Sequence, residues 1–180
     1  MTNYAGATSI VSSPFYELEI AKLQHDAAVL AWDCYVARAQ GSPLKVTVGH
    51  IQVPLSAKSR TEWFNGIARR LDSLTRLKAG WSGPDSRPVD DHLAADALRL
   101  IDEVTKTNTP EPFVNPTASG GVLTEWQVAK LDLSIELTHD LSLVVLFTDA
   151  EGIAQDWEQT LHSDLSEIKH RVDELSKARK

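Results

Sequence analysis

Polar and apolar residues alternate almost without error through residues 120–149, in three short segments separated by turn-like residues. In residues 131–138, with the sequence LDLSIELT, every odd position is aliphatic and every even position is polar. A period of two places one side of a strand in a core and the other side toward solvent or a partner. The pattern therefore predicts an antiparallel meander of three strands.

Two short turns predict how these strands pair. A two-residue turn at Ala129-Lys130 predicts a register in which Trp126 lies opposite Leu133, Val128 opposite Leu131 and Thr124 opposite Ile135. A loop at residues 138–140 likewise pairs Ile135 with Leu143 and Leu133 with Val145. Both registers place the apolar residues on one buried face. The other face then displays Glu125, Gln127, Asp132, Ser134 and Glu136, with Val144 and Leu146 on the third strand.

Helical spacing of apolar residues marks four further segments, residues 13–40, 59–78, 90–104 and 153–177. Residues 45–53 alternate imperfectly, with a slip at Gly49-His50, and predict a strand with a bulge or a short hairpin. Residues 108–116 contain three prolines and predict an extended connector. We expect an α+β protein in which helices pack mainly on one face of a small antiparallel sheet. Residues 1–13 are predicted to be a flexible N-terminus and residues 14–180 one domain, with a sub-boundary left open near residues 41–60.

Composition is that of a globular protein, with 180 residues, 42% hydrophobic and 24% charged. The net charge of -7 opposes non-specific attraction to nucleic acid or anionic lipid, because that attraction comes from Lys and Arg. A basic partner surface fits this charge better. Nucleic acid is therefore an unlikely partner.

The N-terminal residues have neither the basic start nor the apolar run of a secretory signal. No stretch has the length of apolar residues needed to cross a bilayer, so we expect a cytoplasmic protein without a membrane partner. The single cysteine, Cys34, lies among Trp32, Tyr35 and Val36 and is interpreted as a buried small hydrophobe.

The polar face of the meander raises the question of chemistry. In the predicted register Glu125 lies diagonal to Glu136, about 7 Å away, near enough to share a proton or a metal where solvent is excluded. Acidic residues on the wet face of an open sheet usually serve solvation, which favours a non-catalytic interpretation. Val144 and Leu146 on the same side would be covered by a helix or a partner.

The central segment resembles a group of uncharacterised small bacterial proteins. It carries the turn Gly80-Trp81-Ser82-Gly83, a following helix, a proline-rich approach ending in Pro116-Thr117, then Gly120-Gly121-Val122 and Glu125-Trp126. In that group a Gly-Trp-Asp-Gly turn precedes a helix, and a Pro-Thr, Gly-Gly, Glu-Trp run opens a short sheet. Ser82 stands where the group usually has Asp. The resemblance covers residues 74–137 and implies this architecture and a bacterial or phage origin, without naming a reaction.

These motif residues have a structural interpretation and a functional one. Trp81 would plug a helix corner into the core, Gly120-Gly121 would allow positive φ on entry to the sheet, and Trp126 would anchor the core. The alternative is that Trp81, Gly83 and Gly120 lie together in a pocket for a small ligand or peptide.

Metal and cofactor signatures are weak in this sequence. Asp90-Asp91-His92 point in different directions on a helix, and acids at that position are explained by the helix dipole. His162 and His170 lack the spacing of a zinc helix, and no nucleotide, dinucleotide or hydrolase motif is present. We therefore predict no catalytic residues, no metal and no cofactor.

The C-terminal segment carries a heptad-like seam of Leu161, Leu165, Ile168, Val172 and Leu175. Docking on its own sheet is the favoured interpretation, and homodimerisation or capture of a partner is the second. The sequence as a whole favours a non-enzymatic intracellular protein-binding or regulatory protein, antitoxin-like or from a bacterial or phage gene cluster. The alternative is a small enzyme or ligand-binding domain that uses Glu125 and Glu136.

Overall fold

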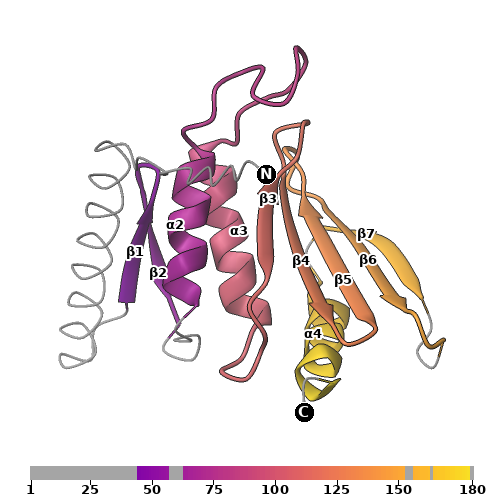
Figure 1. Cartoon of the computed structure of the whole chain (residues 1–180). Coiled ribbons are helices and arrows are strands. Elements are labelled where there is room, and N and C mark those ends of the chain that lie inside the picture. Colours follow the sequence, from indigo (N-terminus) through magenta and orange to yellow (C-terminus); the bar gives the residue numbers. More distant parts are fainter. Residues whose placement is uncertain (1–43, 57–62, 153–155, 163, 179–180) are drawn as a thin grey trace, which may run out of the picture. The chain divides into compact units, whose positions relative to one another are not determined.

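The structure is a computed structural model that describes residues 44–56, 63–152, 156–162 and 164–178. The chain divides into two units, residues 1–41 and 42–180, and all described residues belong to the second unit (Figure 1). The predicted flexible N-terminus, the predicted helix at residues 13–40 and Cys34 lie outside the described residues.

A two-stranded hairpin comes first in the described chain. It consists of β1 (Leu44–Val48) and β2 (Ile51–Leu55), which pair antiparallel with Val46 opposite Val53. The slip in the sequence pattern at Gly49-His50 is the turn of this hairpin, so the hairpin alternative is confirmed. Gly49 has φ of +58°, a left-handed conformation that glycine adopts without steric cost.

Two helices follow the hairpin. The first, α2 (Phe64–Leu74), buries the apolar stripe of Phe64, Ile67, Leu71 and Leu74. The prediction that it continues to residue 78 is wrong, because the amides of Arg76 and Leu77 donate to carbonyls three residues back and close a tight final turn. The second helix, α3 (Asp91–Val104), begins where predicted, and its N-cap Asp90 accepts a hydrogen bond from the His92 amide at 2.8 Å.

The main sheet has five antiparallel strands in sequential order. They are β3 (Phe113–Pro116), β4 (Val122–Val128), β5 (Leu131–Leu137), β6 (Leu143–Asp149) and β7 (Trp157–Leu161). The predicted meander is β4–β5–β6, and the predicted register of its first hairpin is confirmed, with Trp126 opposite Leu133. The predicted α+β class is therefore correct, while the sheet has one more strand on each side of the meander (Figure 1).

The register predicted for the second hairpin is wrong by two residues. Ile135 pairs with Val145, and Leu133 pairs with Phe147. The loop is residues 139–141, because Leu141 adopts φ of +63° and the Thr138 amide donates to the Ser142 carbonyl at 3.0 Å. A shift of two residues keeps side chains on their faces, so the predicted division into a buried and an open face still holds.

The predictions for the two flanking segments require correction. The connector at residues 108–116 ends in β3, which pairs with β4. The helix predicted at residues 153–177 is wrong in its first half, because residues 157–161 form β7 and pair with β6. The helix there, α4 (Ser166–Ala178), begins after Leu165, with residues 153–155 and 163 outside the described chain. Leu161 and Leu165 therefore do not belong to a helical seam.

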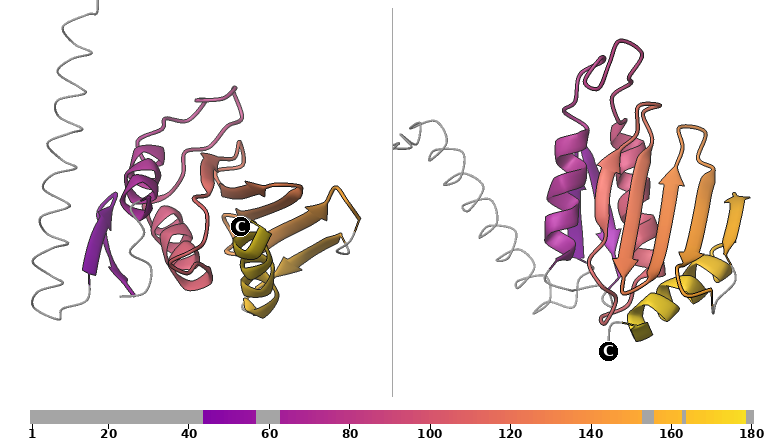
Figure 2. Two further views of the ribbon diagram at one scale, coloured as in Figure 1. Left: turned by 60° about the horizontal axis from the view of Figure 1, so that its bottom comes forward. Right: turned by 45° about the vertical axis from the view of Figure 1, so that its right-hand side comes forward.

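The core lies between the sheet and the helices. The inner face of the sheet carries Trp126, which is only 1% exposed, together with Leu133, Ile135, Val145 and Phe147. Helix α4 packs on β4 and β5, and α2 and α3 lie between the β1–β2 hairpin and the β3–β4 side of the sheet (Figure 2). Ile168, Val172 and Leu175 of α4 are fully buried within this one chain, as the favoured interpretation predicted. No helix of the described chain packs on the opposite face of the sheet, whose side chains are exposed or half-buried.

Candidate functional site

The outer face of the sheet is the candidate site. We use the name outer face for the outward-pointing positions of the five strands, which strand register and exposure define together. They are Phe113, Asn115, Leu123, Glu125, Gln127, Asp132, Ser134, Glu136, Val144, Leu146, Thr148, Glu158 and Thr160.

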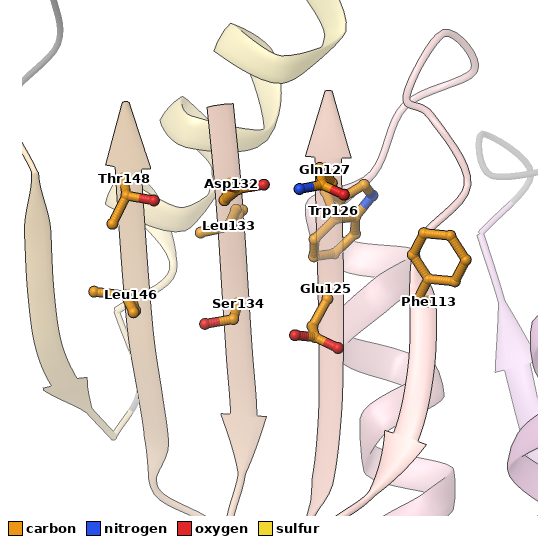
Figure 3. A pocket seen from close by; sticks show the side chains of 9 residues that line it. All are labelled: Phe113, Glu125, Trp126, Gln127, Asp132, Leu133, Ser134, Leu146 and Thr148. Carbon is orange, nitrogen blue, oxygen red and sulfur yellow. The ribbon is translucent and has the colours of Figure 1, made fainter. Parts of the chain in front are cut away.

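Register arranges these side chains in rows across the strands. One row runs from Phe113 through Glu125, Ser134 and Leu146 to Glu158, each paired with the next. Figure 3 shows this row from Phe113 to Leu146, with these two apolar side chains on either side of the polar ones. A second row contains Gln127, Asp132 and Thr148. The two rows line a shallow depression of about 350 Å³, whose floor includes Trp126 and Leu133.

Large apolar side chains are unusually exposed on the outer face. Phe113 is 67% exposed, Leu146 43% and Val144 36%. Scattered exposed hydrophobic residues are ordinary, but a group on one sheet face is typical of a surface that another molecule covers. The exposure that the sequence predicted for Val144 and Leu146 is confirmed. Phe113 was missed because its segment was interpreted as a connector rather than an edge strand.

The charge of the outer face has one sign. Glu125, Asp132, Glu136 and Glu158 are acidic, and no outer-face position carries Lys or Arg. No ion pair within the described residues involves these carboxylates, whereas Glu103, Asp173 and Glu167 on the helices pair with Lys169, Lys106 and Arg171. Uncompensated charge of one sign attracts a partner of the opposite sign. Glu158 was missed because Trp157–Leu161 was predicted to be helical.

The two predicted candidate acids lie in different surroundings. Strand register places Glu125 diagonal to Glu136, as expected. The carboxylate of Glu136, however, accepts a hydrogen bond from the Ser119 hydroxyl at 3.3 Å, in the turn between β3 and β4. Glu125 lines the depression beside Ser134 and Gln127, and Glu136 does not line it. The depression therefore brings together four of the predicted partner-binding residues, Glu125, Gln127, Ser134 and Leu146, with Glu136 and Val144 beyond its rim.

The segment around Trp81 forms a compact loop beside the β3–β4 turn. Trp81 is half-buried, so the prediction that its side chain fills the core at a helix corner is wrong. Its indole N–H donates instead to the Arg87 carbonyl at 3.0 Å and closes the loop on itself. The Arg87 amide donates to Ala118, and Gly120 lies so close to Arg87 and Pro88 that a Cβ there would be 3.1 Å from both. Gly120 has the predicted positive φ, +88°, but the same prediction is wrong for Gly121, where the lack of a Cβ instead permits close approach of the Leu137 carbonyl.

This arrangement explains the motif by packing, since Trp81 and Gly120 both contact the backbone of residues 87–88. Gly83 needs glycine for its backbone, with φ of +140° and open space around it. A ligand pocket at Trp81, Gly83 and Gly120 stays a prediction.

Within the described ranges, no group of three His, Cys, Asp or Glu side chains is placed to hold a metal ion. Asp90 caps α3, and the Asp91 carboxylate accepts a hydrogen bond from the His50 amide at 3.0 Å. These acids therefore have structural partners in the fold. No described helix is long and apolar enough to cross a membrane.

Comparisons with protein-family models, with curated proteins and with solved structures give no match to this chain. Fold and site together define an α+β protein with an acidic, partly apolar open sheet face.

Proposed function

We propose that the chain is a non-enzymatic intracellular protein-binding or regulatory protein that uses the outer face to hold its partner. The observation that carries this proposal is the exposure of Phe113, Val144 and Leu146 on one sheet face. Interfaces are enriched in aromatic residues and combine apolar contacts with direct hydrogen bonds. The depression between Phe113 and Leu146 is lined mainly by polar and acidic side chains, so it gives a basic or hydrogen-bonding partner side chain a place to insert between two apolar contacts.

The charge of the outer face indicates the partner's chemistry. Carboxylates with no basic neighbour on the same face match a surface that presents Lys or Arg between apolar groups. Such a partner would be drawn in by long-range attraction that salt weakens. The concrete form that we propose is antitoxin-like, a bacterial or phage neutraliser that covers a basic functional surface of its target.

Co-purification from the native host tests this proposal. The bait is the tagged full chain as wild type, as the double variant Phe113→Ser/Leu146→Ser, and as the control Leu141→Ser. Leu141 is 54% exposed but lies in the β5–β6 loop, away from the outer face. We expect a stoichiometric partner with the wild type and with the control, and its loss with the double variant. A partner that all three baits retain equally contradicts the proposed surface.

The substituted side chains are exposed, so we expect the double variant to fold with stability within about 0.5 kcal/mol per substitution of the wild type. Circular dichroism and urea unfolding check this before binding is compared. The retained partner should elute as the salt concentration rises, because the Debye length shortens.

A second candidate function is a small enzyme or ligand-binding domain using Glu125 and Glu136. The depression beside Glu125 supports this candidate, because a small ligand could bind there. The Ser119 contact directs Glu136 elsewhere, which weakens a paired-carboxylate mechanism. A small molecule retained by the wild type and lost from a folded Glu125→Gln variant, without any protein partner, would support this alternative over ours.

A further inference from the structure

The two edge strands of the main sheet differ in how their outer edges are covered. At β3, the Val114 carbonyl accepts a hydrogen bond from Arg70 Nε at 3.1 Å, and the Asn115 side chain accepts one from Arg70 as well. Pro116 in the same strand has no amide hydrogen to offer. Helix α2, which supplies Arg70, lies against this edge. The β3 edge is therefore closed to another strand.

The β7 edge has none of these protections within the described chain. It is the last strand in the sheet order, and Figures 1 and 2 show it at the rim of the sheet. Its sequence, WEQTL, has no proline, glycine or lysine. Glu158, Gln159 and Thr160 are exposed, while Trp157 and Leu161 are half-buried. Such an edge offers unpaired backbone groups to a further strand.

We propose that β7 pairs antiparallel with β7 of a second copy of this chain and joins the two sheets into one. The sequence of β7 indicates both the pairing partner, which is the same strand of a second copy, and the register of the pairing. Centring the pairing on Gln159 pairs all residues of the strand, with Trp157 opposite Leu161 of the other copy on the inner side. Glu158 then faces Thr160 of the other copy on the outer side.

The other face-preserving registers are worse. Centring on Glu158 brings the two copies of that carboxylate together, and like charges directly opposite destabilise a sheet. Centring on Thr160 leaves Trp157 beyond the paired region. A shift by one residue would put the inner face of one copy level with the outer face of the other. The strand is thus self-complementary in one register, as a two-fold symmetric interface requires.

This dimer differs from the one that the sequence suggested through the C-terminal helix. The apolar side chains of α4 are buried in their own chain, so that surface is already used. Pairing through β7 leaves α4 and the outer face in place. The inference goes beyond the proposed function, and a dimer would present two outer faces on one continuous sheet.

Disulfide trapping tests the pairing. In a Cys34→Ala background, which removes the single native cysteine, Gln159→Cys places two thiols opposite each other at the symmetry axis. Directly opposite Cα atoms in an antiparallel pair are about 4.5–5.5 Å apart, within the range that a disulfide spans. The control Thr160→Cys places its thiols on either side of the axis, beyond the ~7 Å limit.

We expect mild oxidation to give a covalent dimer with Gln159→Cys and monomer with Thr160→Cys. Light scattering of the wild type should give a dimer mass in parallel, and this measurement holds even where a cysteine variant folds poorly. The dimer should tighten with salt, because each copy carries a net charge of -7. A monomeric wild type at high protein concentration overturns the inference. The β7 edge would then be available only to a strand of a different protein. Equal trapping of both cysteine variants overturns the register and the pairing.

Discussion

The β1–β2 turn provides the sharpest test of the packing between the hairpin and the helices. The Gly49 amide donates to Asp72 of α2, and the His50 amide donates to Asp91 of α3, each at 3.0 Å. Gly49 also has φ of +58°, and a Cβ built there would lie 2.3 Å from the Asp91 Cγ. Replacing Gly49 by Ala therefore combines a backbone penalty with a clash against the carboxylate that holds the turn.

The two contributions can be sized separately. A left-handed backbone at a residue with a Cβ costs about 1–2 kcal/mol. Displacing Asp91 breaks a hydrogen bond to a charged group, worth about 1.5–3 kcal/mol, and the lower end applies because Asp91 is partly exposed. We expect Gly49→Ala to lower the free energy of unfolding by about 3 kcal/mol.

Urea unfolding followed by tryptophan fluorescence measures this change, and two comparisons isolate its causes. Gly152→Ala has a similar φ, +67°, with nothing within 4 Å of the added Cβ, so it should lose only about 1–2 kcal/mol. In an Asp91→Ala background the clash is gone, and Gly49→Ala should cost no more than Gly152→Ala. Equal costs of Gly49→Ala with and without Asp91 would refute the proposed contact.

Three further outcomes are expected. Trp126→Phe should lose about 2–3 kcal/mol in urea unfolding, because the indole N–H donates to the buried Pro110 carbonyl at 3.0 Å; an unchanged midpoint would rule out that bond. Ala129→Gly should raise the free energy of unfolding by about 0.5–1 kcal/mol, since Ala129 has φ of +55°, and a loss of stability would contradict that conformation. Hydrogen bonds from Thr138 and Ser142 lower the pKa of Asp140 to about 2. The resulting stabilisation is complete above pH 3.8 and is lost as the pH falls toward 2. Carboxyl NMR titration should show this pKa returning toward 3.8 in Thr138→Val, and no change would exclude the bond.

The meander was predictable because each of its strands has one buried face. Alternation then fixes which side chains point inward, and the short Ala129-Lys130 turn leaves one register that keeps Trp126 with Leu133. The second hairpin was less determined. Registers two residues apart preserve the faces equally well, and the left-handed Leu141 that decides between them carries no signal of the glycine or asparagine kind.

The edge strands could not be predicted for a related reason. In β7 only Trp157 and Leu161 are apolar, and a spacing of four fits a helix better than an edge strand exposed at most of its positions. Their assignment depends on pairing with β6, which is a tertiary contact. The outer face was thus predicted only in its central strands, and Phe113 and Glu158 came from the fold.

Site-specific photo-crosslinking in the native host tests the role of the outer face most directly. A photoactivatable residue at position 146 lies in the row between Phe113 and Glu158, and the same residue at position 141 serves as the exposed control. We expect a defined adduct with one protein from position 146, reduced by Glu125→Lys, and none from position 141. The absence of an adduct at position 146, or equal adducts from both positions, would contradict protein binding by the outer face.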